Sequence, residues 1–386
     1  MPLVKRLLSE KLTKYLNLFP IVAIVGPRQS GKTTFAKMEL PEWRYFDMEK
    51  PSDYGRVSAD REFFLDQYGD HCIIDEAQVL PELFPALRSY VDRKRVKKGR
   101  IVLLGSVNPL LVKNISETLA GRVGFIEIQP FSYSEAITLR KMELEKFWLN
   151  GGYPEPLLWN ENDRFVWMEQ YMRTFVERDV FALLKTSFSP QQQMQLLTMI
   201  AHNHARLWNA SQTASAFGVS YHTVNRYLEL LETYFLVDRL IPYYQNVGKR
   251  LVKSYKIYFR DTGVLHYLLN ISSIEALRTS PYRGISFEGF VIEQLMRNYR
   301  RESSGTRFYF YRTSQGDEID FLVYNKKGFH AYEIKTSTTI DAGDLKGFKR
   351  CLEQLGLKKG TIVYFGREDF RLDWQIEVKA IHNLLA

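Results

Sequence analysis

The stretch Gly26-Pro-Arg-Gln-Ser-Gly31-Lys32-Thr33 decides the fold, because it fits the pattern G-x-x-x-x-G-K-[ST] of a loop that wraps a nucleoside triphosphate. The apolar run 20–25 before it predicts a buried strand, and residues 34–39 after it predict the start of a helix. The glycines let consecutive backbone N–H groups and the helix N-terminus point at a phosphate. The sequence therefore predicts a P-loop, and a glycine-rich turn with a chance lysine is the alternative.

The side chains of this loop have expected roles in binding ATP and Mg²⁺, which are the predicted cofactors. Lys32 is expected to reach the β- and γ-phosphates, and the Thr33 hydroxyl is expected to hold Mg²⁺. The residues predicted to contact the nucleotide here are Gly26, Pro27, Arg28, Gln29, Ser30, Gly31, Lys32, Thr33 and Thr34.

A short apolar segment, 72–74, is followed by two carboxylates, Asp75 and Glu76. This is the companion motif that a P-loop needs. Asp75 is expected to hold the Mg²⁺ shell, and Glu76 is expected to polarise the attacking water as a general base. A further strand that ends in an acid is expected over 43–47.

Three more residues are candidates for contacts with the γ-phosphate. The apolar run 100–104 predicts a strand, and Ser106 and Asn108 at its end could hydrogen-bond the γ-phosphate or the water, or could belong to a plain turn. Arg122 is a candidate arginine finger that acts on its own or on a neighbouring subunit's γ-phosphate. An ordinary surface arginine is the alternative.

These motifs together resemble the AAA+-type ATPases that carry a C-terminal DUF4143 domain, a bacterial and archaeal family. The resemblance rests on the P-loop, Asp75-Glu76, Gly105-Ser106, Leu119-Ala-Gly-Arg122 and Pro130-Phe-Ser-Tyr-Ser-Glu135. Two later motifs, Gly151-Gly-Tyr-Pro154 and Tyr255-Lys-Ile-Tyr-Phe-Arg-Asp261, extend it over nearly the whole chain. It implies an α/β architecture and leaves the biological pathway open.

Composition limits the classes of protein to which the chain can belong. Its 386 residues are enough for two to four domains, since a domain commonly holds roughly 100–150 residues. No apolar run approaches about 20 residues, so we expect no membrane span and no membrane partner. Two distant cysteines exclude a disulfide scaffold and favour a cytoplasmic location. The formal net charge of +9 favours a polyanionic partner.

Four domains are predicted along the chain. They are an AAA+-type P-loop ATPase domain over 1–140, a helical lid or connector over 141–200, a winged helix-turn-helix over 201–275, and a restriction-endonuclease-like α/β domain of the DUF4143 type over 280–386.

Segments 210–217 and 221–231 predict the helix-turn-helix, with Gly218 ending the first helix and Ser220 capping the second. Segments 235–242 and 249–254 alternate like a two-stranded wing. Possible partners are DNA, or another protein or copy of the chain, since winged helices of ATPases also serve as lids. The residues expected to contact DNA are Tyr221, His222, Thr223, Asn225 and Arg226 in the major groove, and Lys249, Arg250 and Lys253 on phosphates.

The segment 318–335 predicts a hairpin of two strands. If the turn 325–328 closes it, Asp320 falls opposite Glu333, and Glu318 falls opposite Lys335. Strict alternation would place these four charges on one face. The opposite, core-facing set would be Ile319, Phe321, Val323, Tyr332 and Ile334.

Two facing carboxylates beside a lysine match the D…E-x-K pattern of restriction-endonuclease-like nucleases, so Asp320, Glu333 and Lys335 are the predicted catalytic residues. Glu288 joins Asp320 and Glu333 as a predicted metal ligand. The alternative is a solvent-facing hairpin with a plain ion pair. The predicted function is an ATPase that acts on DNA, and the alternative is a slow nucleotide-dependent switch, or a protein-binding ATPase, whose C-terminal domain does not cleave.

Overall fold

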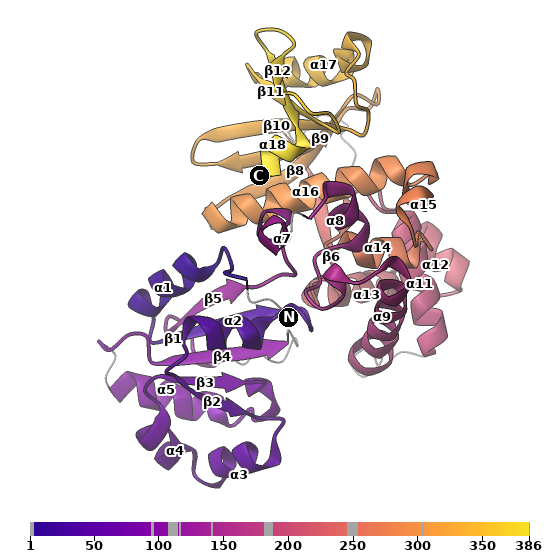
Figure 1. Ribbon diagram of the computed structural model, residues 1–386. Helices are drawn as coiled ribbons and strands as arrows, with labels where there is room; N and C mark the ends of the chain where they lie inside the picture. Colours follow the sequence, from indigo (N-terminus) through magenta and orange to yellow (C-terminus); the bar gives the residue numbers. More distant parts are fainter. Residues whose placement is uncertain are drawn as a thin grey trace. The chain divides into compact units, whose positions relative to one another are not determined.

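The computed structural model describes residues 4–93, 96–106, 115, 117–139, 142–180, 188–244, 254–302 and 305–385. The chain divides into two compact units, Met1–Phe131 with Thr233–Phe235, and Ser132–Glu232 with Leu236–Ala386. A five-stranded sheet forms the centre of the first unit, and the second unit contains helices and an eight-stranded sheet (Figure 1).

All five strands of the first sheet are parallel. Their order is β2 (Arg44–Asp47), β3 (Cys72–Asp75), β4 (Ile101–Ser106), β1 (Ile21–Gly26) and β5 (Val123–Glu127). The four strands that the sequence predicts are therefore confirmed, and β5 is an additional one. Because the strands are parallel, the loop after β1 and the carboxylates at the end of β3 both lie at the carboxyl-terminal ends of the strands. This is where α/β proteins bind ligands.

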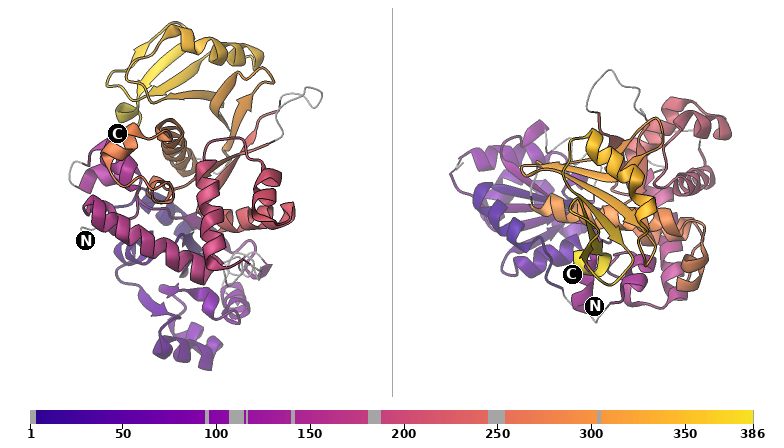
Figure 2. Two further views of the ribbon diagram at one scale, coloured as in Figure 1. Left: turned by 90° about the vertical axis from the view of Figure 1, so that its right-hand side faces the viewer. Right: turned by 90° about the horizontal axis from the view of Figure 1, so that it is seen from above.

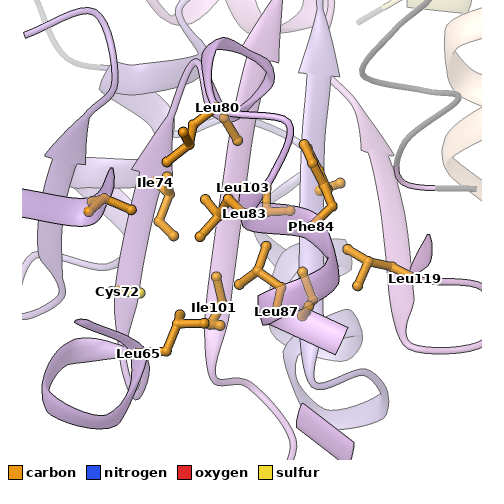
Figure 3. Close-up of a cluster of buried hydrophobic side chains, with 14 of the residues drawn as sticks. Leu65, Cys72, Ile74, Leu80, Leu83, Phe84, Leu87, Ile101, Leu103 and Leu119 are labelled. Atoms are coloured by element: carbon orange, nitrogen blue, oxygen red, sulfur yellow. The ribbon is translucent and has the colours of Figure 1, made fainter. Parts of the chain in front are cut away.

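Helices cover both faces of this sheet, and alternation along the strands supplies two apolar cores. On one face, α1 (Ser9–Leu18) and α2 (Lys32–Glu39) pack on Val22, Ile24 and Val102. On the other face, α5 (Leu83–Arg93) places Leu83, Phe84 and Leu87 over Ile74, Ile101 and Leu103 (Figure 3). The remaining helices of this unit include α3 (Pro51–Ala59) and α4 (Arg61–Tyr68).

The segment 141–200, predicted to be helical, contains α8 (Leu144–Asn150), α9 (Glu161–Thr174) and α11 (Pro190–His202). Two helices that the sequence analysis did not predict, α14 (Thr262–Leu268) and α15 (Ile274–Thr279), follow later in the chain. The helix-turn-helix consists of α12 (Ala210–Phe217) and α13 (Tyr221–Thr233). Gly218 ends α12 with a φ of 63°, and the Ser220 hydroxyl accepts the Thr223 N–H at 3.1 Å.

The eight-stranded sheet joins the middle of the chain to its C-terminal part. Its order is β12 (Phe370–Arg371), β13 (Ile376–Ala380), β11 (Gly360–Tyr364), β10 (Gly328–Lys335), β9 (Glu318–Asn325), β8 (Arg307–Arg312), β6 (Val237–Pro242) and β7 (Lys256–Phe259). Helix α16 (Arg283–Glu302) covers one face and α17 (Lys346–Gln354) the other, and α18 (Ile381–Leu385) follows (Figures 1 and 2).

The strands predicted as a wing differ from the expectation. β6 pairs with β7, which begins at Lys256, and β6 also pairs with β8 of the C-terminal part. Most of the expected second wing strand, including Lys249, Arg250 and Lys253, lies outside the described residues.

The predicted register of the hairpin is confirmed from its turn as far as Tyr332, since Phe329 pairs with Tyr324 and Tyr332 pairs with Phe321. The regular pairing ends there, before the expected pairs of Asp320 with Glu333 and of Glu318 with Lys335. The predicted alternation is wrong at one point. Two residues of β9, Asp320 and Phe321, lie opposite the single residue Phe310 of β8. Because of this β-bulge, Ile319 packs in one cluster with Leu322, whereas Phe321 stacks on Phe308 on the other side of the sheet. Both faces are buried.

Within the described ranges, every helix is too short or too polar to cross a bilayer.

Candidate functional site

The P-loop lies between β1 and α2 in a conformation that needs its glycines. A Cβ on Gly26 would come within 2.0 Å of the Ile128 carbonyl oxygen, and Gly31 has a φ of 87°. Gln29 also has a positive φ, of 61°. The Lys32 ammonium is buried and donates to the carbonyl oxygens of Gly26 and Pro27 at 3.1 and 2.8 Å. The loop thus holds a cation within the turn.

Asp75 connects the P-loop helix to two strands. Its Oδ2 accepts hydrogen bonds from the Thr33 and Tyr45 hydroxyls, each at 2.7 Å, and its Oδ1 accepts the Glu76 N–H at 3.0 Å. Asp75 is only 5% exposed, so these donors compensate the cost of burying a carboxylate. The structure therefore brings together Thr33 and Asp75, the two residues predicted to hold Mg²⁺.

Tyr45 is a member of this site that the sequence prediction missed. It lies on β2, its hydroxyl bonds Asp75, and its ring lies under the Lys37 ammonium, 3.5 Å from the ring centroid. Burial, followed by the bond to Asp75, raises its pKa, so that the hydroxyl stays a donor. The available signal was that the predicted strand 43–47 lies beside the strand that ends in Asp75.

Burial lowers the pKa of Lys32 to about 8, while the charges of Glu76 and Asp75 act in the opposite direction. A bound phosphate would favour the charged ammonium in the same way as these carboxylates. The loop is therefore electrostatically suited to a polyanion.

Glu76 occupies a left-handed backbone conformation, with a φ of 49°, which is uncommon for a residue other than glycine. Its carboxylate accepts a hydrogen bond from the Gln78 side-chain amide. Unusual backbone conformations of this kind concentrate at functional sites. Gln78 is a second residue that the sequence prediction missed.

The other predicted nucleotide contacts have the following positions. Ser30 is buried, its hydroxyl donates to the Pro27 carbonyl at 2.8 Å, and its own carbonyl accepts from Arg6 at 3.1 Å. Thr34 is exposed in the first turn of α2. Ser106 ends β4 beside Gly26, and its side chain is not described. Asn108 lies outside the described residues. Arg28 is partly buried in the turn between β1 and α2.

Whereas the P-loop lies at the carboxyl-terminal ends of the strands, Arg122 lies at their amino-terminal ends. It immediately precedes Val123, which pairs with Ile21 at the start of β1. The length of β1 therefore separates it from the loop, about 17 Å at 3.3 Å per residue. Its guanidinium holds Asp92 through two hydrogen bonds of 2.7 Å. Arg122 does not reach the γ-phosphate site of its own chain in this structure.

The residues at the P-loop fit a magnesium ion. Thr33 and Asp75 offer the hydroxyl and carboxylate oxygens that this cation prefers, and the two groups are already joined by a hydrogen bond. When bound, the ion would neutralise phosphate charge.

We predict that Tyr45→Phe weakens the binding of Mg²⁺ and leaves metal-free nucleotide binding unchanged, because only a hydrogen bond to Asp75 is lost. The Mg²⁺ concentration that gives half of the ATP-linked rise in melting temperature should increase roughly tenfold. Tyr54→Phe, a change of an exposed tyrosine in the same unit, is the control. Equal Mg²⁺ dependence in all three proteins would contradict the role of Tyr45.

A second cluster of charges lies where β9 and β10 meet. The Asp320 Oδ2 accepts the Ile334 N–H at 2.8 Å, and Lys335 donates to Glu333 at 2.7 Å. Glu333 is only 8% exposed. The hairpin therefore brings Asp320, Glu333 and Lys335 close together as predicted, but in a largely buried place and not on a solvent-facing surface.

Lys256 is the central cation of this cluster, and the sequence prediction missed it. It is 4% exposed, bonds Glu288 at 3.1 Å, and forms an ion pair with Glu318. The Tyr258 hydroxyl donates to the same oxygen of Glu288 at 2.6 Å. Burial alone would lower the pKa of Lys256, but Glu288, Tyr258 and Glu318 raise it well above its usual value. The available signal was the alternation along β7, which places the side chains of Lys256 and Tyr258 on one face.

The carboxylates of this cluster do not fit a metal ion as they lie. Among the described side chains, no group of three or more His, Cys, Asp or Glu is arranged to hold one. Glu288, a predicted ligand, is bound by Lys256 and Tyr258, and the other two predicted ligands have the partners given above. Lysine ammonium groups, those of Lys256 and Lys335, occupy the place beside the glutamates that a metal ion would need.

We predict that Asp320→Asn raises the melting temperature at neutral pH. Burial, and then the charges of Glu333 and Glu288, raise the Asp320 pKa well above its usual value. An acid whose folded pKa is raised destabilises the fold once the pH exceeds its unfolded pKa of about 3.9. The gain should therefore be absent at acid pH, appear as the pH rises above about 4, and level off above the folded pKa.

Asp317→Asn is the control of opposite sign, because a hydrogen bond from Arg350 lowers the Asp317 pKa. This variant should melt at or below the wild-type temperature at neutral pH. Thermal unfolding followed by circular dichroism at several pH values measures both, and a lower melting temperature for Asp320→Asn at pH 7 would contradict the prediction.

Three family models match consecutive parts of the chain. They are an AAA domain over residues 18–137, the domain of unknown function DUF8612 over 141–275, and the domain of unknown function DUF4143 over 283–384. Among solved structures, the Walker-type ATPase of Pyrococcus abyssi is 16% identical and covers 68% of this chain and 94% of its own, with a TM-score of 0.46.

Two curated relatives match most of the chain. These proteins, of Mycobacterium tuberculosis and Mycobacterium bovis, are described as uncharacterized, and each is 36% identical over 368 residues, which is 94% of this chain and 80% of the relative. The chain therefore belongs to the family of these mycobacterial proteins, with an AAA-type P-loop ATPase domain followed by a DUF4143 domain.

Proposed function

We propose that the first unit binds and hydrolyses Mg·ATP and that this activity controls binding of DNA by the second unit. The observation that carries the first part is the hydrogen bond of 2.7 Å between Thr33 and Asp75, formed beside a buried Lys32. The P-loop and the acidic strand end come from distant parts of the sequence, and the fold joins them in the arrangement that an ATPase needs.

Each group at the P-loop and at the end of β3 has a role in the proposed reaction. Backbone N–H groups of residues 27–33 bind the β-phosphate, and Lys32 exchanges its carbonyl partners for phosphate oxygens. Thr33 and Asp75 hold the metal, and Tyr45 keeps Asp75 oriented. Glu76 orients the attacking water and accepts its proton after release from Gln78.

We predict that Lys32→Ala abolishes ATP turnover by weakening nucleotide binding. Glu76→Gln should keep binding but lower the turnover rate by at least about 100-fold, because a general base contributes on this scale. Steady-state phosphate release and nucleotide binding, measured on the same preparations, separate the two effects. Equal turnover in wild type and both variants would remove the ATPase proposal.

The proposal that DNA is the partner of the second unit rests on the helix-turn-helix. Along α13, Val224, Tyr227 and Leu228 are buried, while Tyr221, His222 and Arg226 are exposed. This is the division between core face and reading face that a recognition helix requires. Thr223 is occupied in capping the helix, and Asn225 accepts a hydrogen bond from Tyr255 at 3.4 Å.

We predict that Arg226→Ala weakens the binding of duplex DNA roughly 5- to 100-fold, as expected for one lost arginine contact to a base edge in the major groove. Arg173→Ala is the control, because Arg173 is an exposed arginine of α9 that pairs with Glu177. Fluorescence anisotropy at several salt concentrations measures both variants. Duplex affinity that is independent of salt would indicate a protein-binding function for this region instead.

For the C-terminal part, the partners of the acidic cluster favour the non-cleaving alternative. The three glutamates of the cluster are matched by three cations. Lys256 pairs with Glu288 and Glu318, and Arg312 also pairs with Glu318. Lys335 pairs with Glu333, so these glutamates already have counterions. We therefore propose that this part of the chain binds without cutting. Cleavage of DNA in Mg²⁺ or Mn²⁺ that is lost in both Asp320→Ala and Lys335→Ala would restore the nuclease hypothesis.

A further inference from the structure

One face of the eight-stranded sheet continues beyond the helix that covers it. Helix α17 packs on Leu322 and Ala331 through Phe348. Further along the same strands, the hairpin of β9 and β10 extends past α17 (Figure 1). Tyr324 and Phe329, which are paired across this hairpin, lie at its far end.

Four aromatic side chains form a continuous row on this face, which we call the aromatic face: Tyr243, Tyr309, Tyr324 and Phe329. Ring centroids are 4.8 Å apart for Tyr324 and Phe329, 5.0 Å for Phe329 and Tyr243, and 5.4 Å for Tyr243 and Tyr309. Tyr324 is 44% exposed, and the other three are half-buried because their inner edges contact the core under α17. The row thus extends from the core to the solvent.

The charged residues next to Tyr324, on the adjacent strand and in the hairpin turn, are basic. Arg307 pairs with Tyr324 across β8 and β9, and Lys326 and Lys327 form the turn of the hairpin. All three are exposed. No Asp or Glu occurs in the segments 305–312 and 321–332. A flexible polyanion with flat apolar groups would complement such a surface.

We propose that the aromatic face binds single-stranded DNA. Unpaired bases stack on exposed aromatic rings and phosphates bind neighbouring cations, which is how proteins hold single strands on the face of a sheet. A duplex offers only base edges, because its base faces are stacked inside. The choice of DNA rather than RNA rests on the proposed function, in which the helix-turn-helix of the same unit binds duplex DNA.

The test uses the full-length protein and fluorescence anisotropy with labelled oligothymidylate, oligouridylate and a DNA duplex. Tyr324→Ala should weaken binding of oligothymidylate roughly 5- to 100-fold, the loss expected for one stacked base. Tyr324→Phe keeps the ring and should bind like wild type. Trp374→Ala, which removes an exposed ring beside β12 at the other end of the sheet, should also bind like wild type.

The charges are tested with a variant that carries both Lys326→Ala and Lys327→Ala. Its affinity for oligothymidylate should depend less steeply on salt, by about 1.4 units for two phosphate contacts. Melting temperatures of all variants should stay close to wild type, because the substituted side chains are exposed. An unchanged salt dependence in this variant would contradict the assigned phosphate contacts.

The inference and the proposed function fail separately. If Arg226→Ala weakens duplex binding while Tyr324→Ala leaves oligothymidylate binding unchanged, the aromatic face is not a DNA site and the helix-turn-helix proposal stands. If oligothymidylate binds through Tyr324 and no duplex binds, the reverse holds. Tighter binding of oligouridylate would overturn the choice of DNA, and self-association lost in Tyr324→Ala would make this face a contact between copies.

Discussion

The hydrogen bond between Thr33 and Asp75 depends on a constraint that organises the whole first unit, namely that its five strands run parallel. In a parallel sheet the carboxyl ends of all strands lie on the same side, so residues far apart in sequence are brought together there. β1 supplies the P-loop, β3 supplies Asp75 and Glu76, and β2 supplies Tyr45. The two buried cores above and below the sheet hold these strand ends in place. Arg122 immediately precedes β5, at the amino-terminal ends of the strands, which is why it is remote from its own site.

A second constraint acts in the other unit, where the middle and the C-terminal part of the chain share one sheet. β7 carries Lys256 into a cluster of acids that belong to α16 and β9. The motif that contains β7, residues 255–261, also contacts the segment that follows helix α8. Asp261 accepts the Gly152 N–H at 2.7 Å, and a Cβ on Gly151 would approach the Asp261 carboxylate to within 2.2 Å. The two motifs that extend the family resemblance beyond the ATPase domain are therefore in contact, and they have a structural role.

Much of the fold was predictable from the sequence because the signals were local. The P-loop, the four apolar strands around it, the Gly218 turn with its Ser220 cap and the hairpin register each follow from a few neighbouring residues. What was missed depends on contacts between distant segments. Tyr45 and Lys256 are ordinary residues of strands until their neighbours are known, and the bulge at Asp320 depends on pairing with β8. β5 was missed because Gly124 and Glu127 leave it only three apolar residues, which is too short an apolar run to predict a strand.

The most direct test of the proposed ATP site is a double-mutant cycle on Thr33→Ala and Asp75→Asn, read as the rise in melting temperature caused by Mg·ATP and as Mg²⁺-dependent nucleotide affinity. If the hydroxyl and the carboxylate hold one metal together, the two losses are not additive, and the coupling should be about 1–3 kcal/mol. Additive losses would mean that the two groups act independently, and would contradict a shared magnesium site at the carboxyl-terminal ends of the strands.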